Sequence, residues 1–552
     1  MTVRLIITLA LGIQALWLAF HYNMHMFQLN VYLNNEQREW LQKNRHMQWI
    51  LDFAAIFGAV RLLIAATGIV WLDWIAEVIA WLTLLVIILV YRLLKEMNLK
   101  KPLVFTARVK RMAVSDAVLC VLIAVLAVAI AGLAGGFSDA ADNDLLQRFP
   151  LSAYLLLITG LQKFMVMAAN TVNKPIEKGI NQHYINDARR ILAEYPDLLI
   201  IGVTGSYGKT SVKFYLETLL KQKFNVLVTP ESYNTPMGVV KTIRGMLRPV
   251  HEIFVCEMGA RYVGEIKELC DIVHPKHGII TSIGPQHLDT FGSIENIQKT
   301  KFELADALPD DGILFLNGDN EYIADELKEK RAIPGKLGPI DDPEFYHSEK
   351  IGKGYYASDI KVSDMGTSFT VTTPARETQR FSMKLVGAHN VINVMGAIAV
   401  ANRLGIDLKE LRVPVRRLRP VPHRMELKTK GDVTIIDDAF NSNPIGSKAA
   451  VETLALFSGM RILITPGMVE LGADEDEYNR RFGTYAAKCC DKVLLVGSKH
   501  TEPIKEGLLS EGFDERNIEV FDRVTDAIDF AYGIRTGSHK YILLENDLPD
   551  NY

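Results

Sequence analysis

The feature that most constrains the fold of this chain is a set of long apolar stretches near its start. A helix needs about 20 apolar residues to cross the core of a bilayer. Five stretches approach that length, at residues 4–20, 49–70, 72–94, 112–135 and 150–169. The sequence therefore predicts an α-helical, multi-pass transmembrane region over residues 1–170.

Three details of these stretches affect the interpretation. The first has the apolar core of a signal peptide, but no small-residue cleavage site follows it, so we expect a retained helix. The last is short and carries Gln162 and Lys163 near its end, which makes it the weakest. Arg61 lies inside the second, where it either faces the helix bundle or contacts an anionic lipid headgroup.

The charges of two loops predict the orientation. Segment 95–111 has six Lys and Arg residues against one Glu, whereas segment 135–149 has three Asp and one Arg. Because loops rich in Lys and Arg stay in the cytoplasm, the first loop should be cytoplasmic and the second outside. The rest of the chain should then lie on the cytoplasmic side of the cell membrane.

The remaining two thirds of the sequence are typical of a soluble α/β protein. The net charge of −3 shows no basic excess, so we expect no nucleic-acid partner. The five cysteines show no C-x-x-C spacing and are odd in number, which favours a reducing compartment. Residues 171–197 combine apolar positions at helical spacing with charges of both signs, and we expect an amphipathic connector there.

The stretch "LLIIGVTGSYGKTSV", residues 198–212, has the pattern of a phosphate-binding loop between a buried strand and a helix. The full pattern G-x-x-x-x-G-K-[ST] would place a glycine at Val203. Backbone N–H groups and the helix dipole favour anions at such a turn. Lys209 should reach the β- and γ-phosphates, and the Thr210 hydroxyl should bind Mg²⁺. The residues expected to bind nucleotide here are Gly205, Ser206, Gly208, Lys209, Thr210 and Ser211.

The shorter loop T-G-[ST]-x-G-K-[ST] resembles that of the Mur ligase superfamily, whose members use ATP to join amino acids or peptides to a carboxylate. The resemblance extends over about residues 198–540 and is nearest to the branch that adds D-alanyl-D-alanine to UDP-N-acetylmuramoyl-tripeptide. The further motifs, in the family's order, are "TPESYNTPMGV" (229–239), "EIFVCEMGARYVGEI" (252–266), "GIITSIGPQHLDTFGSIENIQKTKFEL" (278–304), "GILFLNGDN" (312–320), "LVGAHNVINVMGAIAVANRLGI" (385–406), "RPVPHRMELKTKGDVTIIDDAFNSNPIGSKAAVETL" (419–454) and "ITPGMVELGADEDEYNRRFG" (464–483).

This resemblance implies a P-loop-type central ATPase domain over residues 198–420 and a Rossmann-like C-terminal domain over residues 421–552. It also implies roles for individual residues. Glu257 and His287 would hold two Mg²⁺ ions, and Lys301, carbamylated in several members, would bridge metal. Asn317 would read the adenine edge, while Arg424 would reach the ATP phosphates and Asp438 would contact the nucleotide. The implied catalytic set is Lys209, Glu257, His287, Lys301 and Arg424, and the implied metal ligands are Thr210, Glu257, His287 and Lys301.

Two segments depart from the family's pattern. Thr465-Pro466 replaces part of the last motif, and the end of the chain, "YILLENDLPDNY" (541–552), lacks the usual lysine-glycine-serine pattern. Tyr207 also stands where the family more often has a small or polar residue. Its ring is either exposed on the surface or packs against the acceptor or the closing domain.

The family's reaction implies a carboxylate acceptor that ATP converts to an acyl phosphate, which the amine of an amino acid or dipeptide then attacks. In peptidoglycan precursor metabolism the acceptor would be a lipid-linked or UDP-linked muramyl peptide. The apolar stretches stand where related ligases carry a small UDP-gripping domain, so the lipid bilayer is an expected partner and the catalytic domains are expected in the cytoplasm. Two alternatives stay open: a membrane-bound poly-γ-glutamate-type synthase, and a membrane-anchored ATPase or scaffold that has lost ligation.

Overall fold

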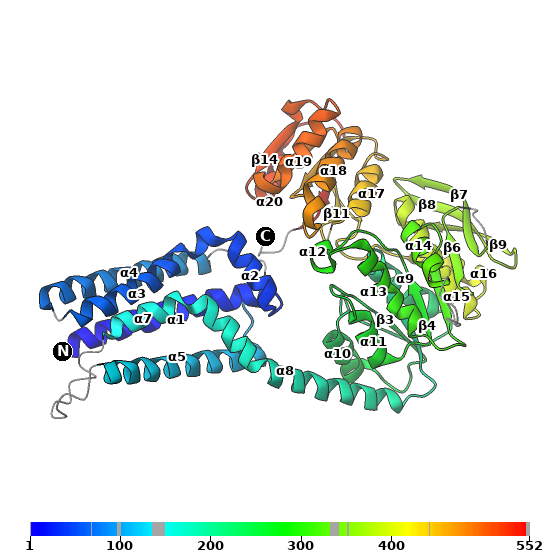
Figure 1. Cartoon of the computed structure of the whole chain (residues 1–552). Helices are drawn as coiled ribbons and strands as arrows, with labels where there is room; N and C mark the ends of the chain where they lie inside the picture. Colours follow the sequence, from blue (N-terminus) through cyan, green and yellow to red (C-terminus); the bar gives the residue numbers. More distant parts are fainter. Residues whose placement is uncertain are drawn as a thin grey trace. The chain divides into compact units, whose positions relative to one another are not determined.

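The structure is a computed structural model (Figure 1). The residues that it describes are 2–67, 69–96, 101–134, 150–331, 342–349, 353–440 and 442–547. They divide into two compact units, one that ends at Asn181 and one that begins at Gln182. The expected outer loop, 135–149, lies outside the described residues, as does part of the expected cytoplasmic loop.

The first unit is entirely α-helical in its described part. Its helices are α1 (Thr2–Leu29), α2 (Asn34–Lys43), α3 (Arg45–Ala66), α4 (Val70–Glu96), α5 (Ala107–Ala134), α7 (Leu151–Gly160) and the start of α8 (Gln162–Ala193). Among the described residues, three helices are long and apolar enough to cross a membrane, over Val3–Leu29, Gln48–Ala65 and Val70–Leu94. These match the first three expected stretches, and α5 lies over the fourth.

The fifth expected stretch, 150–169, is broken. Helices α7 and α8 meet at a bend of 69°, so together they form one broken span or a re-entrant segment. The polar residues that weakened this stretch explain the break. The Gln162 side chain donates to Asp116 Oδ1 at 2.8 Å, and Lys163 pairs with Asp52 on α3. Buried polar groups require such partners, and the bend directs both toward neighbouring helices.

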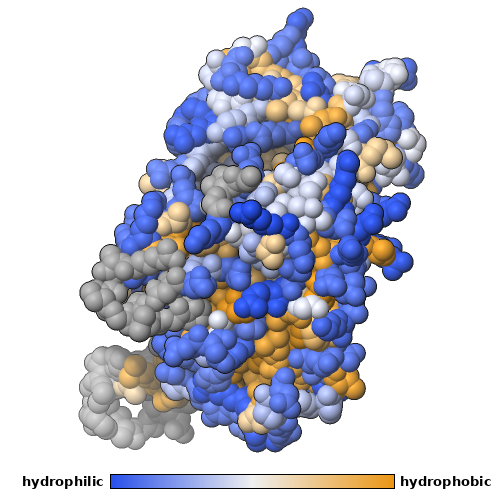
Figure 2. All heavy atoms as spheres, turned by 90° about the vertical axis from the view of Figure 1, so that its right-hand side faces the viewer, coloured by the Kyte–Doolittle hydropathy of each residue, from blue (hydrophilic) through white to orange (hydrophobic). Residues whose placement is uncertain are grey.

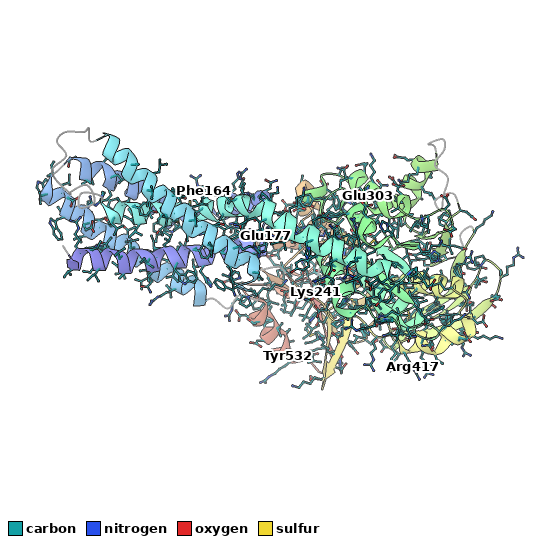
Figure 3. The ribbon with its side chains drawn as sticks, turned by 90° about the horizontal axis from the view of Figure 1, so that it is seen from below. Phe164, Glu177, Lys241, Glu303, Arg417 and Tyr532 are labelled. Carbon is teal, nitrogen blue, oxygen red and sulfur yellow. The ribbon has the colours of Figure 1, made fainter. Side chains whose placement is uncertain are left out.

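Helix α8 then continues without interruption through the expected connector. Figure 3 marks Phe164 and Glu177 along it. The Glu177 carboxylate accepts two hydrogen bonds from Arg111 of α5, at 2.7 and 2.9 Å. A bidentate pair of this kind fixes the rotation of both helices about their axes.

Arg61 faces the interior of the helical bundle. Its side chain is fully buried and lies 2.6 Å from Asp73 and 3.1 Å from Glu77, both on α4. The Glu77 carboxylate also accepts hydrogen bonds from Thr8 at 2.9 Å and Ser152 at 2.6 Å. These contacts join α1, α3, α4 and α7. The bundle-facing interpretation of Arg61 is therefore the one that the structure favours, because the guanidinium is already paired inside the protein.

We predict that Arg61→Met destabilises the helical unit more than Arg4→Met does. Arg4 also pairs with Glu77, at 3.0 Å, but its side chain is one third exposed. Removing one member of a buried ion pair typically costs about 3–5 kcal/mol, whereas a pair open to its surroundings contributes at most about 1 kcal/mol. Thermal unfolding of the full chain in detergent measures the difference. Equal midpoints for the two variants would contradict the prediction.

The second unit contains two sheets, and the first has nine strands in the order β2-β3-β1-β4-β5-β6-β7-β8-β9. In this order the strands from β2 to β7 run parallel. Strand β8 then pairs antiparallel with β7, and the edge strand β9 pairs antiparallel with β8. The strands are β1 (Leu199–Thr204), β2 (Val226–Val228), β3 (Ile253–Glu257), β4 (His277–Ile280), β5 (Ile313–Asn317), β6 (Glu344–His347), β7 (Tyr355–Ser363), β8 (Gly366–Thr372) and β9 (Thr378–Met383).

Helices cover both faces of this sheet, and each face has its own hydrophobic core. One core includes residues of α9 (Lys209–Leu220), α15 (Ala388–Arg403) and α16 (Leu408–Arg417). The other includes residues of α10 (Pro236–Met246), α11 (Glu265–Val273), α13 (Ile294–Asp306), α14 (Glu321–Arg331) and the end of α8. Because β1 is covered on both faces, it reads as a continuous apolar run.

Val203, where the longer phosphate-loop pattern would have glycine, is a strand residue. It is fully buried in β1 and lies opposite Glu257 of β3 and Ile279 of β4. The phosphate loop therefore begins only after Thr204. A valine suits this position because a β-branched side chain packs well in a central strand.

The second sheet has six strands in the order β10-β11-β15-β12-β13-β14, all parallel except the edge strand β10. Its strands are β10 (Glu426–Lys430), β11 (Val433–Asp438), β12 (Met460–Thr465), β13 (Lys492–Val496), β14 (Ile518–Phe521) and β15 (Lys540–Glu545). Its helices are α17 (Pro444–Leu454), η1 (Gly472–Asp474), α18 (Glu475–Cys489), α19 (Ser498–Ser510), η2 (Glu515–Asn517) and α20 (Val524–Gly533). Hydrophilic residues cover much of the face drawn in Figure 2. The two sheets have the α/β character that the sequence predicts.

Candidate active site

The phosphate loop connects the end of β1 to the start of α9. Gly205 and Gly208 have φ values of 148° and 80°, which favour glycine. A Cβ atom on Gly205 would lie 2.2 Å from Thr281 Oγ1, and one on Gly208 would lie 2.5 Å from Asn393 Oδ1. Lys209 Nζ donates to Gly205 O at 2.6 Å and to Ser206 O at 2.9 Å. Lys209 thus folds back over the loop, and the two glycines let the loop pack closely against Thr281 and Asn393.

Glu257 ends β3 directly beside this loop and is fully buried. Its Oε1 atom accepts from the Thr210 hydroxyl and from the Asn234 amide, each at 3.1 Å. Its Oε2 atom lies 3.1 Å from Nζ of Lys213, which is also fully buried. The sequence pointed to Glu257 and Thr210 but not to Lys213. The signal that could have found Lys213 is its position one helical turn after Lys209, on the side of α9 that faces the sheet.

Lys209 is the electrostatic centre of the expected site. Burial lowers the pKa of Lys209 to about 8, Glu257 opposes this shift, and Arg424 adds to it. Burial also lowers the pKa of Lys301 well below its usual value, and the charge of Lys209 adds to that shift. Such Coulomb effects require proximity. The structure therefore gathers these four expected residues around the phosphate loop.

His287 joins the same neighbourhood from the segment after β4. Burial lowers the pKa of His287 and the charge of Lys209 adds to the shift, while Glu470 opposes it. The His287 Nδ1 atom makes a close contact with Glu470 Oε2, and Arg261 donates to Glu470 Oε1 at 2.8 Å. Burial alone would raise the pKa of Glu470, but His287 and Arg261 outweigh it and lower the pKa. Glu470 and Arg261 were not predicted as site residues.

Arg424 and Asp438 come from the C-terminal part of the chain. The Arg424 guanidinium stacks over the Phe440 ring, 4.5 Å from its centroid. Burial lowers the pKa of Arg424, while the charges of Asp438 and Glu257 raise it. Burial raises the pKa of Asp438 to about 6, and Arg424 opposes this shift. Arg424 therefore lies close enough to both Asp438 and Glu257 for their charges to act on it.

Comparison with known proteins decides the family. Residues 203–401 match the Mur ligase middle domain, and residues 423–544 match the Mur ligase glutamate ligase domain. The chain is 30% identical over 337 residues to the UDP-N-acetylmuramoyl-tripeptide–D-alanyl-D-alanine ligase of Escherichia coli, covering 59% of this chain and 72% of that protein. It is 31% identical over 333 residues to the Bacillus subtilis enzyme of the same name, covering 60% and 69%. This chain belongs to the Mur ligase family.

The solved structures agree with this Mur ligase fold. MurF from Acinetobacter baumannii superimposes with a TM-score of 0.59 at 23% identity, covering 66% of this chain and 77% of that one. MurF ligase from Thermotoga maritima, in complex with ADP, gives a TM-score of 0.57 at 24% identity, covering 66% and 80%. Membership of this family makes the chain an ATP-dependent amide-bond ligase related to these enzymes.

Two of the residues singled out in this Mur ligase have hydrogen bonds that the sequence did not predict. The Asn317 amide donates to Thr281 O at 2.9 Å and accepts from the Asp319 N–H at 3.1 Å, so it braces the loops around the site. Its contact with adenine stays a prediction. The Tyr207 hydroxyl donates to Pro285 O at 2.7 Å, and the residue is half-buried. The interpretation of Tyr207 as an exposed surface residue is therefore wrong.

The metal ligands also stay a prediction. Among the described residues, no three His, Cys, Asp or Glu side chains lie close enough together to hold a metal ion. The expected set instead depends on the Thr210 hydroxyl and on a modified Lys301. The oxygens of Thr210 and Glu257 already lie 3.1 Å apart, and hard oxygen donors suit Mg²⁺. These two residues therefore fit the ion.

The two departures from the family's pattern meet in space. Glu545, at the end of β15, is fully buried and accepts hydrogen bonds from Ser442 and, at 3.0 Å, from the Thr465 hydroxyl. The next residue, Asn546, donates from its side chain to Gly467 O at 2.6 Å. The unusual segment after β12 and the unusual end of β15 thus form one polar cluster.

We predict that Glu545→Gln stabilises the C-terminal domain at neutral pH. Burial raises the pKa of Glu545 to about 8, Asp438 adds to the shift, and the hydroxyl groups of Ser442 and Thr465 oppose it. A folded-state pKa above the unfolded value of 4.5 favours the folded state most at low pH, and this advantage is lost as pH rises toward 8. The amide does not titrate, so the gain should reach on the order of 1–3 kcal/mol near pH 7.

Thermal unfolding at pH 5 and at pH 7.5 measures this effect. The variant should unfold at a higher temperature than the wild type at pH 7.5, with little difference at pH 5. Glu519→Gln is the control, because that side chain is 45% exposed and lies in the same domain. If the difference in unfolding temperature between the variant and the wild type does not grow from pH 5 to pH 7.5, Glu545 is ionised in the folded protein and the prediction is wrong.

Proposed function

We propose that this Mur ligase joins the carboxylate of a muramyl peptide to the amine of an amino acid or dipeptide at the cytoplasmic face of the cell membrane. The observation that carries the proposal is one chain that holds both a Mur ligase site and long apolar helices. The names of the relatives support a role in peptidoglycan precursor metabolism.

The phosphate loop is proposed to bind ATP. Gly205, Ser206, Gly208 and Ser211 supply the turn, Lys209 carries the positive charge toward the β- and γ-phosphates, and Asn317 faces the base. Two Mg²⁺ ions would be held by Thr210, Glu257, His287 and Lys301, and they would supply positive charge for the phosphates. The glycines with positive φ and the place of the loop at the start of α9 support this proposal, because backbone N–H groups at such a turn favour an anion.

The chemistry brings a negative carboxylate to a negative phosphate, so the chain must supply cations. Lys209 lies at the loop and Arg424 reaches in from the C-terminal domain, where a planar guanidinium suits a phosphate. Asp438 shares this neighbourhood and would contact the nucleotide. Since Arg424 and Asp438 belong to a different domain from the loop, docking of the two domains assembles the site and excludes water from the acyl phosphate.

Lys301 is proposed to carry a carbamate. It is 2% exposed, and burial lowers its pKa well below the usual value, which favours the neutral amine. A neutral amine is the form that adds to CO₂, with release of a proton. Carbamylation would convert a buried cation, which is costly, into an anion that can face metal ions.

The acceptor is proposed to be lipid-linked. The same chain holds apolar helices long enough to span a membrane and a Mur ligase site, so the helices would hold the ligase at the bilayer. A ligase held at the bilayer favours a substrate that is itself in the membrane. The competing hypothesis is a soluble UDP-linked acceptor, with the helices as an anchor. A poly-γ-glutamate-type synthase is a further outcome that the second experiment below separates.

We predict that Lys209→Ala and Glu257→Gln each lower ligation at least about 100-fold. Glutamine is chosen at position 257 because its amide oxygen can still accept from Thr210 and Asn234, whereas both glutamine and alanine remove the charge that faces Lys213. The assay is phosphate release with the full chain, measured with and without the amine. Wild-type release should require both acceptor and amine. Phosphate release at the same rate with and without the amine would identify an ATPase that has lost ligation. Full activity of both variants would contradict the proposed site.

The acceptor is identified by mass spectrometry of cell-wall precursors after depletion of the protein. We expect lipid-linked muramyl peptides that lack the added amino acid or dipeptide to accumulate. Accumulation of the UDP-linked forms alone would assign the helices to anchoring. Unchanged precursors together with loss of a glutamate polymer would favour the synthase.

A further inference from the structure

A salt-bridged contact joins the middle and C-terminal domains beside the expected metal site. Glu470 lies between β12 and η1, in a left-handed backbone conformation with φ of 65°. Its Oε1 atom accepts from Arg261 at 2.8 Å, and its Oε2 atom contacts His287 Nδ1. Its backbone carbonyl also accepts from the Leu288 N–H at 3.1 Å. One residue of the C-terminal domain therefore contacts three residues of the middle domain.

His287 is fixed by these contacts in a defined orientation. Its backbone adopts φ of 53°, and its carbonyl accepts from the N–H groups of Thr290 and Phe291 at 3.1 and 3.0 Å. In the ring, Nδ1 is engaged by Glu470, while Nε2 has no hydrogen-bond partner in the part of the chain that the structure describes. A carboxylate at Nδ1 selects the tautomer with the proton on that nitrogen. The lone pair is then on Nε2, which is the nitrogen left for a metal ion.

We infer that Glu470 is a positioning residue that orients the His287 imidazole for metal binding from the C-terminal domain. The inference rests on the metal role proposed for His287. Carboxylate groups that hold a metal-binding histidine commonly orient its ring and increase its basicity. Here the carboxylate belongs to a different domain from the histidine, so metal binding and docking of the C-terminal domain favour each other.

Arg261 distinguishes this role from simple domain docking. It binds the same carboxylate from another segment of the middle domain. If Glu470 only docked the domains, Arg261→Met would weaken metal binding as much as Glu470→Ala. If Glu470 orients the imidazole, Glu470→Ala should weaken metal binding more than Arg261→Met does. Glu470→Gln should weaken it less than Glu470→Ala, because an amide oxygen still accepts from Nδ1.

The test uses Mn²⁺ in place of Mg²⁺, with electron paramagnetic resonance of the full chain in detergent and a non-hydrolysable ATP analogue present. Free and bound Mn²⁺ are counted during titration, so the readout does not depend on ligation. The variants are Glu470→Gln, Glu470→Ala, Arg261→Met and His287→Ala. The control is Glu477→Gln, a half-exposed acid of the same domain that pairs with Arg480 and Arg481. Affinity for the analogue without metal and the unfolding temperature are recorded for each.

We expect His287→Ala to lose one Mn²⁺ site and Glu470→Ala to weaken that site by about 10- to 100-fold, with unchanged metal-free analogue affinity. Arg261→Met should weaken it less, and the control should match the wild type. If His287→Ala keeps both sites, the proposed metal role of His287 fails. If His287→Ala loses a site but Glu470→Ala binds Mn²⁺ like the wild type, the positioning role alone fails. Equal losses in Glu470→Ala and Arg261→Met would reduce Glu470 to a docking contact.

Discussion

The ligase site depends on one buried carboxylate, that of Glu257. A carboxylate with no exposure to solvent is tolerated only when it is paired and hydrogen-bonded. Lys213 of α9, Thr210 at the end of the phosphate loop and Asn234 before α10 provide those partners. The phosphate loop, its helix and the loop that precedes α10 are thereby held against the end of β3. Displacing any of these segments would leave buried charge or polar groups without partners.

The C-terminal domain supplies the groups that the middle domain lacks. The charges of Asp438 and Glu257 both act on the Arg424 guanidinium, and Glu470 contacts His287 from the same domain. Glu545 lies behind this surface, buried among hydroxyl groups and close to Asp438. Glu470 is therefore paired across the boundary, whereas burial favours the protonated forms of Asp438 and Glu545. This arrangement suits a site that must collect cations around phosphates when the domains dock.

Several features of the site were predictable because they depend on contiguous sequence. The apolar lengths of the first helices, the buried strand before the loop and the loop itself are local patterns. Other features depend on contacts between distant segments. His287 and Glu470 are 183 residues apart, and Arg261 and Glu470 are 209 apart. In the sequence Lys213 is one polar position of a helix, and only the fold places Glu257 beside it. The break between α7 and α8 also depends on partners elsewhere, Asp52 and Asp116.

The sequence by itself determined the two-part organisation, the phosphate loop and the family, because hydrophobic length and ordered motifs are properties of the chain alone. Through its resemblance to the family, the sequence also predicts that Glu257, His287, Lys301, Arg424 and Asp438 serve one site. Only the tertiary structure decided which groups neutralise or orient them. The physical reason is that burial sets the cost of each charge, and burial is known only when strands, helices and both domains have packed. Lys213, Glu470 and the Thr465–Glu545 pair are the residues in which that packing decided the chemistry.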